Sequence, residues 1–246
     1  MKSVLFGVVA LAICIVALPV NAALIITNGD FETGGGDNID DVADWMDPTD
    51  GTFWHGTWQT NSEWITPNGT NVVLLGSHDV PTDANIGTMT GPVSAGTGIN
   101  YLYQSIGTAD SATSLPLSFD WGAPNDDPGD RGLGLRVAVY AYSGSGFSPD
   151  NNTDVEGDAS MTLLDSADFE MTSTGVDGLI VGETVSLDLS GAGSQELFLR
   201  FNNYRSADTE AWPVLDNVSI VVPEPASLVL LGFGGLALMA SGRRRG

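Results

Sequence analysis

The stretch Leu133-Gly134-Leu135-Arg136-Val137-Ala138-Val139-Tyr140-Ala141-Tyr142 alternates between two kinds of side chain. Its odd-numbered positions are all Leu, Val or Ala, whereas its even-numbered positions include an arginine and two tyrosines. Successive side chains of a β-strand point to opposite faces of a sheet, so a period of two predicts a strand with one buried face. The stretch therefore indicates a chain built from β-sheets.

The chain on either side of this stretch consists of short apolar runs separated by loops rich in Gly, Asp, Asn, Ser and Thr. Such loops are typical of turns between strands, and no long segment keeps the period of a helix. We predict the other strands at residues 24–27, 71–75, 101–106, 115–121, 161–165, 184–189, 196–202 and 214–222. Many short strands without helices predict an all-β fold, a single antiparallel β-sandwich domain over residues 23–221.

Two acidic segments interrupt the predicted strands. Residues 34–52 carry six aspartates around Trp45, and we predict a long surface loop there. Residues 150–158 space their oxygen atoms like the start of an EF-hand calcium loop. However, Val155 stands where the turn glycine belongs and Met161 stands where the bidentate glutamate belongs. We therefore favour a solvated acidic loop over a metal site in this second segment.

The N-terminus has the features of a secretory signal peptide. Lys2 precedes an apolar run over residues 4–18, and small residues end the segment at Ala22, as signal peptidase requires. We predict a signal helix over residues 1–22 with cleavage after Ala22. A lipoprotein signal at Cys14 is the alternative, but the bulky Ile13 precedes it and the apolar run continues past it. Cys14 is the only cysteine, so the cleaved chain has no disulfide.

Three features follow one another at the C-terminus: Val222-Pro223-Glu224-Pro225, an apolar run over residues 226–240, and the cluster Arg243, Arg244 and Arg245. The apolar run is short for a spanning helix, which takes about 20 residues. Arginines after a span hold that end in the cytoplasm and place the preceding domain outside. Residues 222–246 therefore predict a weak transmembrane helix that anchors an exported domain.

The domain between the two ends is strongly acidic. It contains 30 acidic residues, four arginines and no lysine, a net charge of −26. Nucleic acids and anionic lipid headgroups are bound mainly through Lys and Arg, so this charge excludes both as partners of the domain. Metal cations and neutral sugars remain compatible with it. The alternative is that the acidity only keeps a secreted protein soluble.

The order of Pro-Glu-Pro, weak span and arginine cluster resembles the PEP-CTERM sorting signal of Gram-negative bacteria. The resemblance implies recognition by an exosortase, a membrane cysteine protease, in bacteria that make extracellular polysaccharide. It also implies transient anchoring in the inner membrane and delivery to the cell surface or extracellular matrix. A plain C-terminal anchor is the alternative, but it explains the span and the arginines without explaining Pro223-Glu224-Pro225.

A second resemblance covers most of the domain. Its motifs are Ile26-Thr27-Asn28-Gly29-Asp30-Phe31-Glu32, Tyr103-Gln104-Ser105-Ile106, Leu117-Ser118-Phe119-Asp120-Trp121 and Leu215-Asp216-Asn217-Val218-Ser219-Ile220. These are similar to the first, middle and last strands of galactose-binding-like jelly rolls, the fold of many carbohydrate-binding modules. The resemblance implies a jelly-roll sandwich. Because this fold hosts lectin-like, structural and enzymatic proteins, the fold alone does not decide the function.

A structural calcium ion is one implication of this second resemblance. In the resembling modules such an ion often joins the start of the first strand to the acidic residue of the last strand. By position, Asp30, Glu32 and Asp216 are the predicted ligands of a Ca²⁺ cofactor. The alternative is that Asn28, Gly29 and Asp30 only form a turn, while Asp216 accepts hydrogen bonds from the backbone.

Aromatic residues between positions 53 and 64 form the candidate sugar site. Sugar rings present apolar C–H faces that pack on flat side chains, and Trp54, Trp58 and Trp64 are the predicted contacts for extracellular polysaccharide. The alternative is that these tryptophans are part of the core, where most aromatic side chains at alternating strand positions lie.

Signs of catalysis are weak in this sequence. His55 and His78 lack neighbouring metal-ligand patterns. Neither Ser143 nor Ser145 has a glycine two positions before it and another two positions after it, as a nucleophile elbow requires. The expectation is therefore a non-catalytic, surface-delivered protein that binds carbohydrate. The alternatives are a purely structural matrix protein and, with less support, a polysaccharide hydrolase or lyase.

Overall fold

The computed structural model describes residues 24–36, 41–47, 55–59, 69–75, 77–78, 101–109, 112–122, 132–144, 146–149, 154–172, 180–205, 210–211 and 213–221. These ranges consist of strands, turns and coil, without any helix. In particular, they include no helix with the length and apolar character that a membrane crossing needs. The predicted signal helix over residues 1–22 and the predicted transmembrane helix within residues 222–246 lie outside them.

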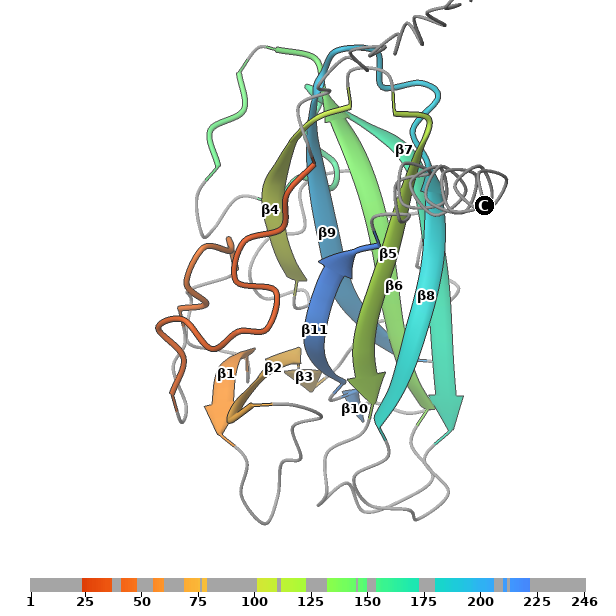
Figure 1. Ribbon diagram of the computed structural model, residues 1–246. Coiled ribbons are helices and arrows are strands. Elements are labelled where there is room, and N and C mark those ends of the chain that lie inside the picture. Colours follow the sequence, from red (N-terminus) through yellow and green to blue (C-terminus); the bar gives the residue numbers. More distant parts are fainter. Residues whose placement is uncertain are drawn as a thin grey trace, which may run out of the picture.

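The strands in the described ranges are β1 His55–Gln59, β2 Asn71–Leu75, β3 Ser77–His78, β4 Tyr101–Thr108, β5 Ser114–Gly122, β6 Gly132–Tyr142, β7 Met161–Thr172, β8 Ile180–Asp188, β9 Glu196–Arg205, β10 Glu210–Ala211 and β11 Val214–Ile220. They form a five-stranded sheet in the order β1-β2-β11-β5-β8 and a four-stranded sheet in the order β4-β9-β6-β7. Strands β3 and β10 pair separately. Figure 1 shows the two sheets as two layers.

The long strands pair as a nested set of antiparallel hairpins. The innermost pair is β6 with β7, followed by β5 with β8, β4 with β9, and β2 with β11. A nested hairpin folded into two sheets has the strand order of a jelly roll. The predictions of an all-β chain and of antiparallel sheets are therefore confirmed.

The main hydrophobic core lies between the two sheets. Inward-facing side chains of both sheets meet there, and the ring of Phe119 on β5 lies 5.4 Å from that of Phe201 on β9 and 5.2 Å from that of Phe169 on β7. On β6, the apolar positions from Leu135 to Ala141 that alternation assigned to one face are all buried in this core. The described residues of this core lie between Leu24 and Ile220.

The opposite face of β6 differs from the prediction of a single buried face. Ala138 and Tyr140 on this face are also buried, in a second cluster with Tyr101, Tyr103 and Phe198. The described residues 146–149 and 154–160 contribute Phe147 and Val155 to this cluster. The outer face of the four-stranded sheet is therefore buried around Ala138, Tyr140 and Phe198, whereas Asp168 on the edge strand β7 is 43% exposed.

The opening segment also differs from prediction, because residues 24–27 do not form a strand. The segment runs beside the edge strand β4, where Ile25 N–H donates to the carbonyl of Ile106 at 3.0 Å. The backbone groups of Thr27 bond to a side chain instead. Gln104 Oε1 accepts from Thr27 N–H at 2.8 Å, and Gln104 Nε2 donates to Thr27 O at 3.0 Å. Gln104 thus replaces the ladder that a strand would have formed.

The predicted surface loop around Trp45 is wrong in one respect. Trp45 and Val42 are buried in the main core, with the ring of Trp45 5.7 Å from Phe31 and 6.2 Å from Phe201. Met46 and Tyr103 exchange both of their backbone hydrogen bonds, at 2.8 and 2.9 Å. Val42 and Trp45 therefore anchor residues 41–47 to the core, while Asp41 and Asp44 stay exposed.

Candidate functional site

Three of the motifs that resemble galactose-binding-like jelly rolls meet in the structure. Strands β5 and β11, which carry two of them, are neighbours in the five-stranded sheet. The opening motif joins β11 through Val218 N–H, which donates to Gly29 O at 2.8 Å. Gly29 is required there, because a Cβ atom at this position would collide with the carbonyl oxygen of Val218.

Glu32 connects the opening motif to the start of β2. Its Oε1 accepts from the backbone N–H groups of Thr70 at 2.7 Å and Asn71 at 2.9 Å. Its Oε2 accepts from the Thr70 hydroxyl at 2.8 Å and from the Asn71 side-chain amide at 2.9 Å. Desolvation alone would raise the pKa of Glu32, but the hydrogen bonds from Asn71 and Thr70 outweigh it and lower the pKa.

The other two predicted calcium ligands also accept hydrogen bonds from the backbone. Asp30 Oδ1 accepts from Glu32 N–H at 3.4 Å, and Asp216 Oδ1 accepts from Asn217 N–H at 2.7 Å. Within the described ranges, no group of three or more acidic, His or Cys side chains is arranged to hold a metal ion. The contacts seen are those of the turn alternative, and calcium binding by Asp30, Glu32 and Asp216 stays a prediction.

An open polar groove crosses β11, β5 and β8 on the outer side of the five-stranded sheet. It has a volume of about 530 Å³ and is lined by Ser118, Phe119, Asp120, Gly182, Glu183, Thr184, Asn217 and Ser219. The strand register explains its polarity, because Ser118 pairs with both Thr184 and Ser219, and Asp120 pairs with Gly182. Leu117, Phe119 and Trp121 alternate with these residues and face the core. We call this feature the polar groove.

A bulge in β11 arranges the side chains of the polar groove. The register of β11 against β5 shifts between Asp216 and Ser219, and Asn217 has a positive φ of 52°. This conformation turns the Asn217 amide toward β5, where its Nδ2 donates to Asp120 Oδ2 at 2.8 Å. The hydroxyls of Ser118 and Ser219 bond each other at 2.8 Å. The groove thus combines a carboxylate, an amide and hydroxyls, the groups that bind sugar hydroxyls in proteins.

A smaller pocket of about 250 Å³ lies at the edge strand β4. Its aromatic lining residues, Tyr103 and Phe198, are buried and leave no ring face open to a ligand. The Gln104 side chain that lines it is engaged by Thr27. Its main polar group is therefore already satisfied, which leaves the polar groove as the better candidate site.

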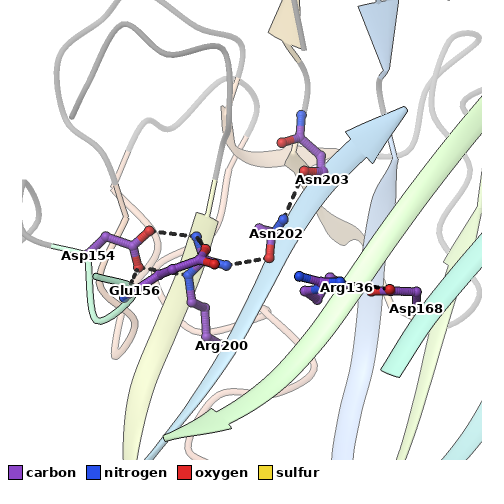
Figure 2. Close-up of polar contacts among 7 residues, drawn as sticks. All are labelled: Arg136, Asp154, Glu156, Asp168, Arg200, Asn202 and Asn203. Carbon is purple, nitrogen blue, oxygen red and sulfur yellow. Dashed lines mark hydrogen bonds and ion pairs between the residues drawn. The ribbon is translucent and has the colours of Figure 1, made fainter. Parts of the chain in front are cut away.

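The described part of the acidic segment, residues 154–158, is not the solvated loop that the sequence predicted. Asp154 is fully buried and pairs with Arg200 of β9 through both oxygens, at 2.7 Å from Nε and 2.5 Å from Nη2 (Figure 2). Glu156 lies 2.9 Å from the same Nη2 atom, and Arg200 also donates to Asn202. These contacts hold residues 154–156 over the second cluster, that of Tyr101, Tyr103 and Phe198. Their role is therefore structural, and they do not form a metal site.

Charge and burial shift the pKa values of Arg200 and Asp154 in opposite directions. Burial alone would lower the pKa of the Arg200 guanidinium, but the charges of Asp154 and Glu156 outweigh it and raise the pKa. Burial raises the pKa of the Asp154 carboxyl, and Arg200 opposes that shift. The guanidinium also lies 5.6 Å from the centre of the Tyr101 ring, within the range of a cation–π contact.

The described residues include only part of the predicted tryptophan site. Trp54 and Trp64 fall outside the described residues, and Trp58 lies in β1, where it pairs with Val72 of β2. The two histidines, His55 and His78, lie in β1 and β3. The sugar-binding role of these tryptophans stays a prediction.

The C-terminal residues match a known sorting signal. Residues 221–245 match the model of the PEP-CTERM protein-sorting motif, and this span contains the predicted Val222-Pro223-Glu224-Pro225 and arginine cluster. The motif indicates an exported protein that is held at the membrane before processing by an exosortase. No curated protein sequence matches the chain significantly. The chain is therefore a two-sheet β-protein that carries a PEP-CTERM protein-sorting motif.

Several solved structures are similar to this chain. A cyclase from Fischerella sp. TAU is 18% identical, with a TM-score of 0.52 and coverage of 80% of this chain and 94% of the cyclase. The arabinose-bound α-L-arabinofuranosidase MgGH51 is 12% identical, with a TM-score of 0.50 over 80% of this chain and 26% of the enzyme. TmCBM61 in complex with β-1,4-galactotriose is 12% identical, with a TM-score of 0.44 over 80% and 97% of the two chains. At these identities, the cyclase and the arabinofuranosidase establish the fold alone.

Proposed function

We propose that this chain is a non-catalytic protein of the Gram-negative cell surface or extracellular matrix, whose β-domain binds extracellular polysaccharide. The sorting motif supports delivery to the surface. The observation that carries the binding proposal is the polar groove, an open site where a carboxylate, an amide and three hydroxyl side chains line one face of the sheet. Its volume of about 530 Å³ falls within the usual range of ligand sites.

The placement of acidic residues around the polar groove supports binding over hydrolysis. A glycosidase needs two carboxyl groups that both reach the substrate. Glu183 pairs with the inward-facing Phe119, so it leaves β8 on the opposite face from Asp120. Asp216 pairs with Asp120 on the same face, but it is only 1% exposed. Asp120 is therefore the only one of these three acids that reaches a ligand from the open face.

A glycan array with the full-length protein, with and without calcium, tests the binding proposal. We expect Asp120→Ala to weaken binding about tenfold or more, because a hydrogen bond to a charged group contributes about 1.5–3 kcal/mol. If the tryptophans instead form the sugar site, Trp58→Ala has the larger effect, about 2 kcal/mol or more. Each affinity is compared with the melting temperature of the same variant, so that loss of folding is recognised.

The array also separates the alternatives. Glycan binding that neither variant changes would contradict both proposed surfaces. An array without any bound glycan would favour the purely structural matrix protein. Shortened glycans in the bound fraction would favour the hydrolase or lyase.

Processing at both ends is a separate expectation of the proposed function. The surface form should begin at Ala23 and end near Val222-Pro223-Glu224-Pro225, because a signal peptidase and an exosortase each remove one end. Intact-mass measurement of protein released from the cell surface checks this. A mass that still includes Arg243, Arg244 and Arg245 would indicate an ordinary membrane anchor instead.

A further inference from the structure

The carboxylate of Asp120 offers one free oxygen to the polar groove. Its Oδ2 accepts from the Asn217 amide at 2.8 Å, whereas Oδ1 accepts no hydrogen bond within the described part of the chain. Oδ1 lies above Gly182, since a Cβ atom built on that glycine would be 3.0 Å away from it. The missing side chain at Gly182 therefore leaves the space in front of this charged acceptor open.

The other groups of the polar groove reinforce its acceptor character. The Asn217 side chain gives a donor N–H to Asp120, and its carbonyl oxygen keeps acceptor capacity. Ser118 and Ser219 share one hydrogen bond between their hydroxyls, and each oxygen keeps acceptor capacity. Asp120 and Glu183 are the acids among the lining residues, and only Asp120 has its side chain on the open face; the lining residues include no lysine or arginine.

A ligand that fits the free oxygen of Asp120 must provide a donor. Hydroxyl and ammonium groups satisfy free carboxylate and amide oxygens, whereas a carboxylate or sulfate on the ligand would meet like charge with no cation to compensate it. The three strands span about 10 Å at the usual spacing of neighbouring strands, enough for a short glycan segment to lie across them.

We propose that the polar groove selects glycan segments rich in hydroxyl or ammonium groups and rejects segments that carry uronate or sulfate. This inference rests on the proposed function, because it names the ligand class of the same groove. Asp120 determines the selection, and Gly182 provides the room for the ligand beside it.

Binding of three hexasaccharides to the full chain in detergent micelles tests this inference. The probes are cellohexaose, a chitosan hexamer and hexagalacturonate, measured at one pH and one ionic strength. We expect the neutral and amino glycans to bind, and the uronate to bind at least about tenfold more weakly. Asp120→Asn should reduce that ratio to near one, whereas Asp188→Asn, which removes one charge from the same face of β8 outside the groove, should preserve it.

Filling the groove provides the matched steric test. Gly182→Val should weaken binding of cellohexaose and the chitosan hexamer about tenfold, because its side chain occupies the space before Asp120 Oδ1. Ser186→Val adds bulk to the same exposed face of β8 two residues beyond Thr184, and it should leave both affinities unchanged. Both variants should keep the melting temperature of the parent chain.

The outcomes distinguish this inference from the proposed function. Hexagalacturonate that binds as tightly as cellohexaose, or Gly182→Val with unchanged affinities, would overturn the inference while leaving carbohydrate binding intact. If none of the three probes binds and the array is also empty, the proposed function and the inference fall together. Discrimination that disappears in Asp120→Asn and persists in Asp188→Asn confirms the assignment.

Discussion

Replacement of Asp154 by alanine is expected to lower the free energy of unfolding by about 3–5 kcal/mol, because it leaves the Arg200 guanidinium buried without its bidentate partner. Both side chains of this pair are fully buried. Glu156 cannot compensate fully, since it contacts only one guanidinium nitrogen and is itself 16% exposed. Urea denaturation of the exported form measures the change, and urea leaves the ionic strength constant.

The chain contains a matched control for this variant. Arg136 and Asp168 also form a bidentate pair, at 2.6 and 2.8 Å, but Asp168 is 43% exposed. Asp168→Ala should therefore cost less than about 1 kcal/mol. The double variant Asp154→Leu with Arg200→Met should recover most of the lost stability, because it removes both fully buried charges together. If Asp154→Ala costs no more than Asp168→Ala, the acidic segment is solvated after all.

The alternation of apolar residues predicted the inner faces of the strands well. The predicted strand at 133–142 agrees with β6 at one end, because its face buried against the second sheet fixes the period of two. The predicted strand at 71–75 agrees with β2 at both ends, although β2 is a continuous apolar run that is buried on both faces. Strand β7 was predicted as residues 161–165 and extends to Thr172. Its polar outer positions Asp168 and Glu170 concealed the continuing strand, since an edge strand tolerates charges that interrupt an apolar pattern.

Burial on the outer side of the four-stranded sheet could not be predicted in the same way. One signal was present: Leu197 to Phe201 has large apolar residues at both odd and even positions, which is typical of a strand covered on both faces. Arg200 inside this run required a buried acidic partner. Thirty acids in the domain made the choice of Asp154, 46 residues away, impossible from sequence alone.

The polar groove could not be predicted from the sequence either, because its residues come from distant parts of the chain. Ser118 and Asp120 alternate with the core residues Leu117, Phe119 and Trp121 in the predicted strand 115–121, so they lie on its other face. Their partner Asn217 lies 97 residues from Asp120, and only the nested pairing of the strands brings them together. A bulge that depends on a positive φ at Asn217 has no clear sequence signal beyond the asparagine itself. The motifs of the fold could therefore be recognised in the sequence, whereas the site that they form could not be predicted from it.

Trp45→Ala is the variant with the other large expected effect, a loss of about 3–5 kcal/mol in the free energy of unfolding. Trp45 is only 2% exposed and contacts the rings of Phe31 and Phe201. Its indole N–H also donates to the carbonyl of Asn28 at 3.2 Å, so alanine removes both core volume and a hydrogen bond to the opening motif. Urea denaturation of the same exported form gives the size of the loss.

Asp44→Asn is the control that separates the core role of Trp45 from the acidity of its segment. Asp44 is exposed and has a positive φ of 69°, a conformation that asparagine tolerates, so this change should stay within about 0.5 kcal/mol. A Trp45→Ala loss of similar size to the control would mean that residues 41–47 lie on the surface, as their aspartates suggested. A large loss confined to Trp45 would instead mean that one aromatic side chain fastens this acidic segment to the core. Its neighbouring carboxylates would then be free to remain in water without weakening the fold.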